Sequence, residues 1–179
     1  MIYKNYNEKK AAQAAGLLLR NAGGEMDYYV LTKILYIAER ESLRKWNKLM
    51  FGGNLVSMEH GPVHGSILDS ARHKDSTSLY WVKHISVPQD NIIRLVDYSI
   101  EDDEMSNREI RLLNDLYEQF GNYSFKDMYK YVHEFPEHED PGTTSIPINV
   151  EEILSQLGRS EEEIRSIEDH VHVMNQALS

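Results

Sequence analysis

The sequence predicts a mainly α protein with α+β character: a compact multi-helix core around a central helix, with one or two small β-hairpins. Three observations support this fold class. Apolar residues recur at helical spacing through most of the 179-residue chain. Residues that commonly cap helices precede several of these segments. Short apolar runs separated by glycine, or by proline and asparagine, interrupt the helical pattern and indicate hairpins.

The strongest helix signal opens the region around which the chain is organised, residues 31–69. Asp27 can cap this helix, and Glu41 and Lys45 have the favoured i,i+4 order of opposite charges. Its apolar face consists of five residues at helical spacing: Leu31, Ile34, Leu35, Ala38 and Trp46. Further apolar and aromatic residues widen this face, so we expect a central helix with neighbours on several sides.

A tight turn and a second helix are predicted next. Residues 52–54, Gly-Gly-Asn, separate the apolar runs 49–51 and 55–58, which indicates a β-turn or a small hairpin. Proline suits the first position of a helix because its φ is fixed and its missing N–H needs no partner there. We therefore expect Pro62 to open a helix whose buried side is Ile67, Leu68 and Ala71.

Two further elements flank this region. The alanine-rich residues 8–22 predict an N-terminal helix that ends at Gly23 and Gly24. Residues 79–87 and 92–96 predict the strands of a second hairpin, because a short segment with proline and asparagine separates two apolar runs.

Helix signals return in the second half of the chain. Ser106 and Glu109 have capping-box spacing, and Ser124 can cap a shorter helix that Pro136 ends. The apolar positions of that shorter helix are Phe125, Met128, Tyr129, Val132 and Phe135. Residues 137–147 predict a surface loop.

The last thirty residues predict two helices, which begin at Asn149 and Ser160. The expected buried side of the final helix is Ile164, Ile167, Val171, Met174 and Leu178. We therefore divide the chain into a domain of residues 1–148 and a C-terminal helical extension, residues 149–179, packed on the same domain.

Composition narrows the functional classes. A formal net charge of −10 opposes binding to phosphate backbones, so nucleic acid is not expected as the primary ligand and a basic protein partner is favoured. The absence of cysteine excludes disulfides, thiolate metal sites and cysteine nucleophiles. No apolar run approaches the roughly 18 residues of a membrane span, and the first residues do not resemble a signal peptide, so we expect a cytoplasmic protein without membrane contact.

No motif specifies catalysis, so we predict no enzyme, no catalytic residue, no metal and no cofactor. The close histidine pairs are His60/His64, His133/His138 and His170/His172. None of these pairs has the spacing that places two imidazoles on one helix face. Glu39, Arg40 and Glu41 could form an acid–base set, but the interpretation we prefer is the solvated end of the central helix.

Two motifs in sequence order carry a family resemblance. Residues 35–40 are Leu-Tyr-Ile-Ala-Glu-Arg, and residues 60–63, after a short glycine turn, are His-Gly-Pro-Val. Over residues 31–69 the chain resembles the Panacea domain family of SocA-like antitoxins. Val132 and His133 stand where many relatives carry a threonine-histidine pair.

The resemblance implies a non-enzymatic antitoxin that neutralises a cognate protein toxin by direct binding. It also implies an alternative, a protease adaptor or scaffold that presents a protein partner to a ClpXP-type AAA+ protease. An uncharacterised metal-dependent hydrolase is a second alternative. Tyrosine and arginine are enriched at the energetic centres of protein interfaces. The predicted partner-binding residues are Tyr36, Glu39, Arg40, Arg44, Glu59, His60, Gly61 and Pro62.

Overall fold

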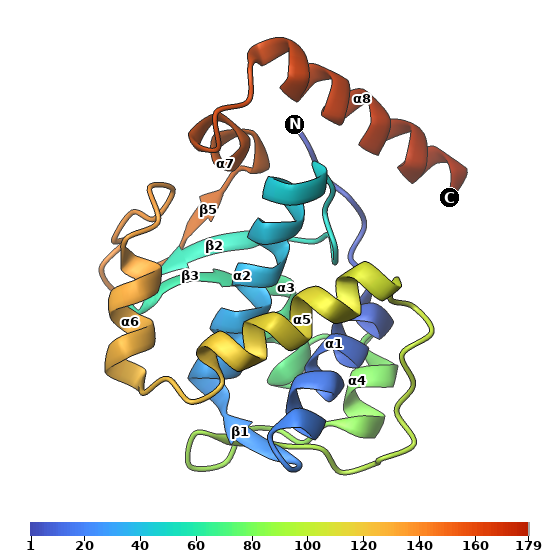
Figure 1. Cartoon of the computed structure of the whole chain (residues 1–179), viewed down its shortest axis with the longest axis vertical. Helices are drawn as coiled ribbons and strands as arrows, with labels where there is room; N and C mark the ends of the chain where they lie inside the picture. The colour runs from blue at the N-terminus through green and yellow to red at the C-terminus, as the bar shows by residue number, and fades with distance from the viewer. Residues whose placement is uncertain (179) are drawn as a thin grey trace.

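The computed structural model describes residues 1–178 and has the predicted mainly α architecture. Helix α2 (Tyr28–Trp46) crosses the middle of the molecule, and other helices lie around it (Figure 1). As expected, the Asp27 side chain caps α2 by accepting a hydrogen bond of 2.9 Å from the backbone N–H of Val30. Every residue from Val30 to Glu39 is buried, which confirms that this helix is central.

Five helices contribute to the main hydrophobic cluster together with α2: α1 (Glu8–Asn21), α3 (Gly65–Ala71), α4 (Leu79–His84), α5 (Asn107–Phe120) and α6 (Phe125–His133). The predicted serine caps of α5 and α6 are confirmed. Ser106 and Glu109 form a reciprocal capping box at the start of α5. At α6, the Ser124 hydroxyl accepts a hydrogen bond of 3.1 Å from the backbone N–H of Asp127.

Two small antiparallel sheets complete the architecture. Strand β1 (Glu25–Asp27) pairs with β4 (Ile92–Arg94) near the start of α2. In the second sheet, β2 (Leu55–Met58) lies between β3 (Gly61–His64) and β5 (Ile146–Ile148). Because β5 comes from the end of the segment predicted as a loop, it joins the C-terminal part of the chain to the β2–β3 hairpin.

Two predictions are wrong in position: the hairpin turn at residues 52–54 and the helix start at Pro62. The hairpin turn is formed by Glu59 and His60, which follow β2, whereas the glycine pair precedes β2. Pro62 lies within β3, opposite Ser57 of β2. β3 is an edge strand, and an edge strand tolerates proline because backbone N–H groups on its outer side have no partner strand. Helix α3 instead begins at Gly65, and the His64 side chain caps it.

The predicted second hairpin is half right. Residues 92–94 form β4 as expected, but the first predicted strand is replaced by the short helix α4. The two buried residues of α4, Trp81 and His84, are three positions apart, which matches one face of a helix. A short apolar run fits a helix or a strand equally well, so periodicity alone could not separate them.

Helices α7 (Val150–Gln156) and α8 (Glu161–Ala177) begin where predicted and form a second hydrophobic cluster. That cluster also includes Ile2 near the N-terminus and two residues of α2, Tyr36 and Leu43. Figure 1 shows α8 along one edge of the molecule, beside the N-terminal segment. The division at residue 148 stays a prediction.

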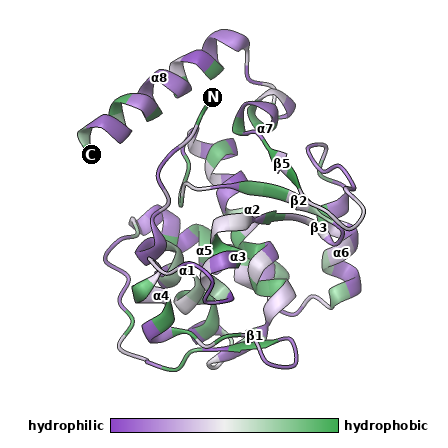
Figure 2. Cartoon of the chain, turned by 180° about the vertical axis from the view of Figure 1, so that it is seen from behind, coloured by the Kyte–Doolittle hydropathy of each residue, from purple (hydrophilic) through white to green (hydrophobic). Residues whose placement is uncertain are grey.

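The predicted buried side of α8 is only partly confirmed. Ile167 and Val171 are buried, whereas Met174 is 44% and Leu178 is 72% exposed. Figure 2 shows hydrophobic residues gathered around the middle of the molecule, while α8 is largely hydrophilic. Within residues 1–178, no helix combines the length and the apolar character needed to cross a bilayer.

Candidate functional site

A buried carboxylate fixes the segment that follows α6 onto α2. The Glu137 side chain accepts hydrogen bonds from the Tyr36 hydroxyl (2.8 Å) and from Arg40 Nε (2.7 Å). The Arg40 guanidinium also lies 4.3 Å from the ring centroid of Phe135. Burial, followed by the nearby negative charge of Glu137, raises the pKa of Tyr36 well above its ordinary value. Tyr36 therefore stays a neutral hydrogen-bond donor.

A second buried carboxylate, Glu39, joins α2 to the segment before β2 and to the last residue of β3. It accepts hydrogen bonds from the backbone N–H groups of Met50 and Phe51, the latter at 3.0 Å. Its Oε2 lies 3.4 Å from His64 Nε2. Because His64 Nδ1 accepts a hydrogen bond from the backbone N–H of Ile67, the proton of a neutral ring is on Nε2, facing Glu39.

Six aromatic rings gather where α6 meets the start of α2 and the turn of the hairpin. We call this group the ring cluster: Tyr29, His60, Phe125, Tyr129, His133 and His138. The ring centroids of Tyr29 and Phe125 are 4.4 Å apart, and those of Tyr129 and His133 are 3.7 Å apart in a stacked arrangement. Phe125 is 47% and Tyr129 is 37% exposed, so the cluster forms part of the surface.

Polar contacts hold the histidines of the ring cluster in place. His133 Nδ1 lies 2.7 Å from the carbonyl oxygen of Tyr129, and its Nε2 lies 3.3 Å from that of Glu59. The Tyr29 hydroxyl donates a hydrogen bond of 2.7 Å to the carbonyl oxygen of His60. These contacts connect α2, α6 and the β2–β3 turn, so the rings are held on a rigid base.

A cavity of about 520 Å³ adjoins the ring cluster. It lies between the start of α2, the hairpin turn, the start of α6 and the loop at residues 142–144. Its walls are mainly apolar and aromatic, with contributions from Tyr28, Tyr29, Met58, Val63, Leu68 and Phe125. Concave, largely apolar sites of this size are typical of small-molecule binding.

Lys33 is a buried cation in the wall of this cavity. It is 3% exposed, and its Nζ donates a hydrogen bond of 2.9 Å to the carbonyl oxygen of Pro62. The Nζ atom also lies 5.1 Å from the ring centroid of Tyr29. Burial lowers the pKa of Lys33 from 10.5 to about 7, since removal from water disfavours the charged form.

The comparison with protein families decides the classification. Residues 31–138 match the model of the family described as antitoxin SocA-like, Panacea domain. The chain belongs to this Panacea domain family. No match was found among curated proteins or among solved structures.

The Panacea match begins within α2, at residue 31, and ends at residue 138, five residues after the end of α6. It therefore includes both buried carboxylate networks and every member of the ring cluster except Tyr29. Helix α1 lies before the matched region, yet its residues from Ala11 to Gly16 are buried in the core, so it completes the same folded body.

The Panacea motif residues are divided between the interior and the surface. Four of the predicted partner-binding residues are buried: Tyr36, Glu39, Gly61 and Pro62. The interpretation of residues 39–41 as the solvated end of α2 is therefore wrong for Glu39, which has no exposed surface. In this conformation these four residues lie beneath the surface, so any direct contact with a partner falls to the other four predicted residues.

The other predicted residues lie nearer to solvent. Glu59 and His60 are exposed on the hairpin turn, while Arg40 is half-buried against Glu137. Arg44 is exposed at the other end of α2, where it forms an ion pair of 2.7 Å with Glu41. Of these residues, His60 is a member of the ring cluster and Glu59 lies next to it on the turn, whereas Arg44 lies apart from the cluster.

Most of the ring cluster is not predicted by the sequence pattern. Phe125 and Tyr129 were expected on the buried face of their helix, but Met128 and Val132 form the buried face of α6. The available signal was the spacing of Phe125, Tyr129 and His133, which are four residues apart and form a separate aromatic stripe. Among residues 1–178, no group of three or more metal-ligating side chains could hold an ion.

Proposed function

We propose that this chain neutralises a cognate protein toxin by direct contact and that the ring cluster is the contact surface. The observation that supports this proposal is the exposure of large rings on a fixed base. Aromatic residues are enriched at the energetic centres of protein interfaces because each buries a large area with few rotatable bonds. Membership of an antitoxin family makes a toxin the expected kind of partner.

Rigid support beneath the rings favours this proposal. Tyr36 and Arg40 hold Glu137, and this contact fixes the segment that continues from α6. His133 bridges α6 to the hairpin turn through the carbonyl oxygen of Glu59. A preordered surface loses less conformational entropy on binding, so its contacts contribute more fully to affinity.

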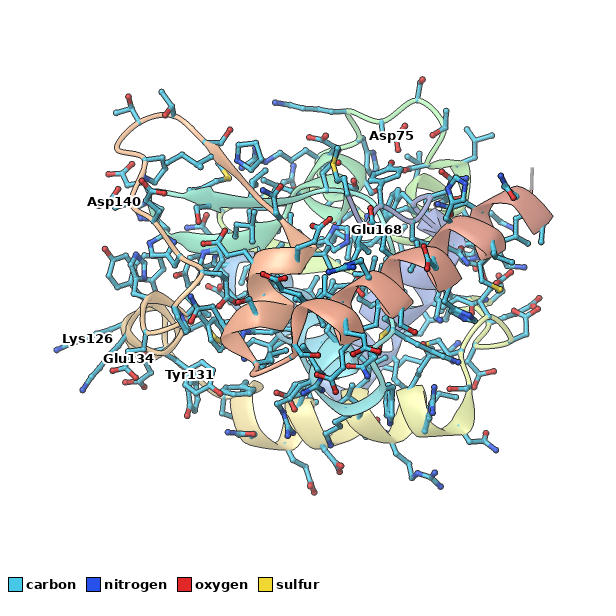
Figure 3. All side chains as sticks on the ribbon, turned by 90° about the horizontal axis from the view of Figure 1, so that it is seen from above. Asp75, Lys126, Tyr131, Glu134, Asp140 and Glu168 are labelled. Carbon is cyan, nitrogen blue, oxygen red and sulfur yellow. The ribbon has the colours of Figure 1, made fainter. Side chains whose placement is uncertain are left out.

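Charge around the ring cluster favours a basic partner. Glu59 lies on the hairpin turn beside the rings, and Figure 3 shows Glu134 and Asp140, together with the single labelled cation Lys126, projecting outward from the same side of the molecule. The whole chain has a formal net charge of −10. Complementary charge mainly raises the association rate, so the proposed toxin binds faster at low salt.

The test is co-expression with the product of the neighbouring gene, followed by co-purification and titration of the pair. Phe125→Ala and Tyr129→Ala each remove an exposed ring, so each is expected to weaken binding at least about tenfold with little change in folding. Leu79→Ala is the matched control, because Leu79 is 73% exposed on α4 and lies outside the ring cluster.

Two outcomes would contradict the proposal. One is a neighbouring product that stays toxic and does not co-purify with the chain. The other is equal binding by the two ring variants and the control, which would remove the ring cluster as the contact surface. Loss of the toxin only in cells that contain a ClpXP-type protease would favour the adaptor alternative.

A further inference from the structure

The cavity beside the ring cluster is lined by two basic side chains that form no ion pair within residues 1–178. Its lining includes Lys33, which is almost fully buried, and Arg72, which is exposed at the rim. Within residues 1–178, neither cation takes part in an ion pair. This arrangement is unusual in a chain with ten more formal negative than positive charges.

The Lys33 ammonium is only partly satisfied by the protein. An ammonium group has three N–H donors, and the carbonyl oxygen of Pro62 accepts from one of them. Burial alone accounts for its lowered pKa, so no nearby carboxylate stabilises the charged form. A buried cation without a counter-ion is costly, and an anion in the cavity would remove that cost.

The carboxylates of the cavity wall do not fill this role. Asp27 is engaged at the start of α2, where it accepts a hydrogen bond from the backbone N–H of Val30. Glu59 is exposed on the hairpin turn and forms no ion pair with any residue of the described part of the chain, residues 1–178. Arg72 Nε donates a hydrogen bond of 3.1 Å to the Tyr28 hydroxyl, which holds a second cation at the rim.

The remaining walls suit an apolar body. Tyr29 and Phe125 lie with their ring centroids 4.4 Å apart, and Val63 and Leu68 contribute aliphatic surface. We propose that this cavity binds a small aromatic carboxylate, with Lys33 as the counter-ion of the carboxylate and the tyrosine and phenylalanine rings against its body. The cavity shares Tyr29, His60 and Phe125 with the ring cluster, but its test uses the isolated chain, so the result does not depend on whether a toxin binds there.

The experiment measures binding of benzoate to the purified chain by ligand-observed and protein-observed NMR. Benzamide, which has the same shape without the charge, serves as the neutral probe. We expect benzoate to shift the amide signals of Tyr29, Thr32 and Val63 and to bind at least tenfold more tightly than benzamide.

Lys33→Met keeps an unbranched apolar side chain and removes the charge, and it is expected to weaken benzoate binding at least tenfold. Lys126→Met is the matched control, because Lys126 projects away from the molecule on α6 and is not part of the cavity wall (Figure 3). That variant should change benzoate affinity less than twofold. Arg72→Gln provides an independent variant at the rim, with an expected loss of at least threefold.

The proposal is overturned if benzoate and benzamide bind equally, if neither binds, or if Lys33→Met binds benzoate as well as the wild type. Binding of a tetraglutamate peptide without binding of benzoate would assign the cavity to an acidic protein segment and would also overturn it. If Lys33→Met does not fold, the position of the amide shifts in the wild type decides the question.

Discussion

Glu39 connects three parts of the chain that are separated in sequence. It receives two backbone N–H groups, from Met50 and Phe51, and faces the proton of His64. These contacts explain why a charged residue occupies a position with no exposure in the middle of α2. The role of Glu39 could not be predicted from sequence, because helical spacing gives its position on α2 but not the backbone segments that reach it.

Replacing Glu39 should therefore destabilise the fold. Glu39→Ala leaves the buried backbone N–H groups of Met50 and Phe51 without an acceptor, so we expect the free energy of unfolding to fall by about 3–5 kcal/mol. Glu41→Gln is the control on the same helix, since its partly exposed pair with Arg44 should contribute about 0–1 kcal/mol. Urea unfolding at pH 7 measures both, and equal losses would contradict the proposed role.

Lys33 predicts a distinct dependence of stability on pH. Its pKa is about 7 in the folded chain and 10.5 ordinarily, so between these values the unfolded chain binds more protons. The free energy of unfolding should therefore rise from pH 7 towards pH 9, by at most about 1.4 kcal/mol per unit. Above that range, Tyr29 opposes the rise, because burial raises its pKa and favours the neutral form in the folded chain.

Comparison of the wild type with Lys33→Met tests this dependence. We expect the variant to be more stable at pH 7, and its advantage to shrink steadily at pH 8 and pH 9 in urea unfolding. Lys126→Met should follow the wild type at each pH, because Lys126 is exposed. An advantage of Lys33→Met that stays constant with pH would show that Lys33 remains charged throughout.

The hairpin and α6 depend on one another through Gly61. Its φ of +107° is rarely adopted by residues with a side chain, and an added Cβ would lie 2.7 Å from Val132 Cγ2. Gly61 and Pro62 lie in strand β3, whereas the sequence predicted that Pro62 opens a helix. The contact with α6 was outside the reach of sequence spacing because the two segments are about seventy residues apart.

Gly61→Ala should disturb both elements. Strain at the positive φ and the clash with Val132 are expected to lower the free energy of unfolding by roughly 1–3 kcal/mol. The variant should also weaken toxin binding, since α6 carries two exposed members of the ring cluster. Gly142→Ala is the control, because its φ is also positive but no atom lies within 4 Å of an added Cβ. Equal losses in both variants would exclude the contact with α6 as a cause.

Helices were predicted well where their signals are local, whereas strands were predicted less completely. The capping serines of α5, α6 and α8 are each confirmed, because a cap depends on residues three positions apart. Strand β5 was missed, since its partner β2 lies about ninety residues earlier in the chain. Three-residue strands have too little alternation to be recognised without that partner.

At the scale of the whole molecule, α2 belongs to two hydrophobic clusters at once. Leu31 and Leu35 face the main cluster, while Tyr36 and Leu43 face the cluster built with α7 and α8. Residues at the start of α2 also form part of the cavity wall and of the ring cluster. The central helix therefore connects the core with the surface where we propose that a toxin binds.

Hydrogen exchange of the chain alone and in complex with its toxin tests this account most directly. We predict that the toxin slows exchange of backbone amides in α6 and in the β2–β3 turn, and leaves α8 unchanged. Slowed exchange confined to α7 and α8, with α6 and the turn unaffected, would contradict the account.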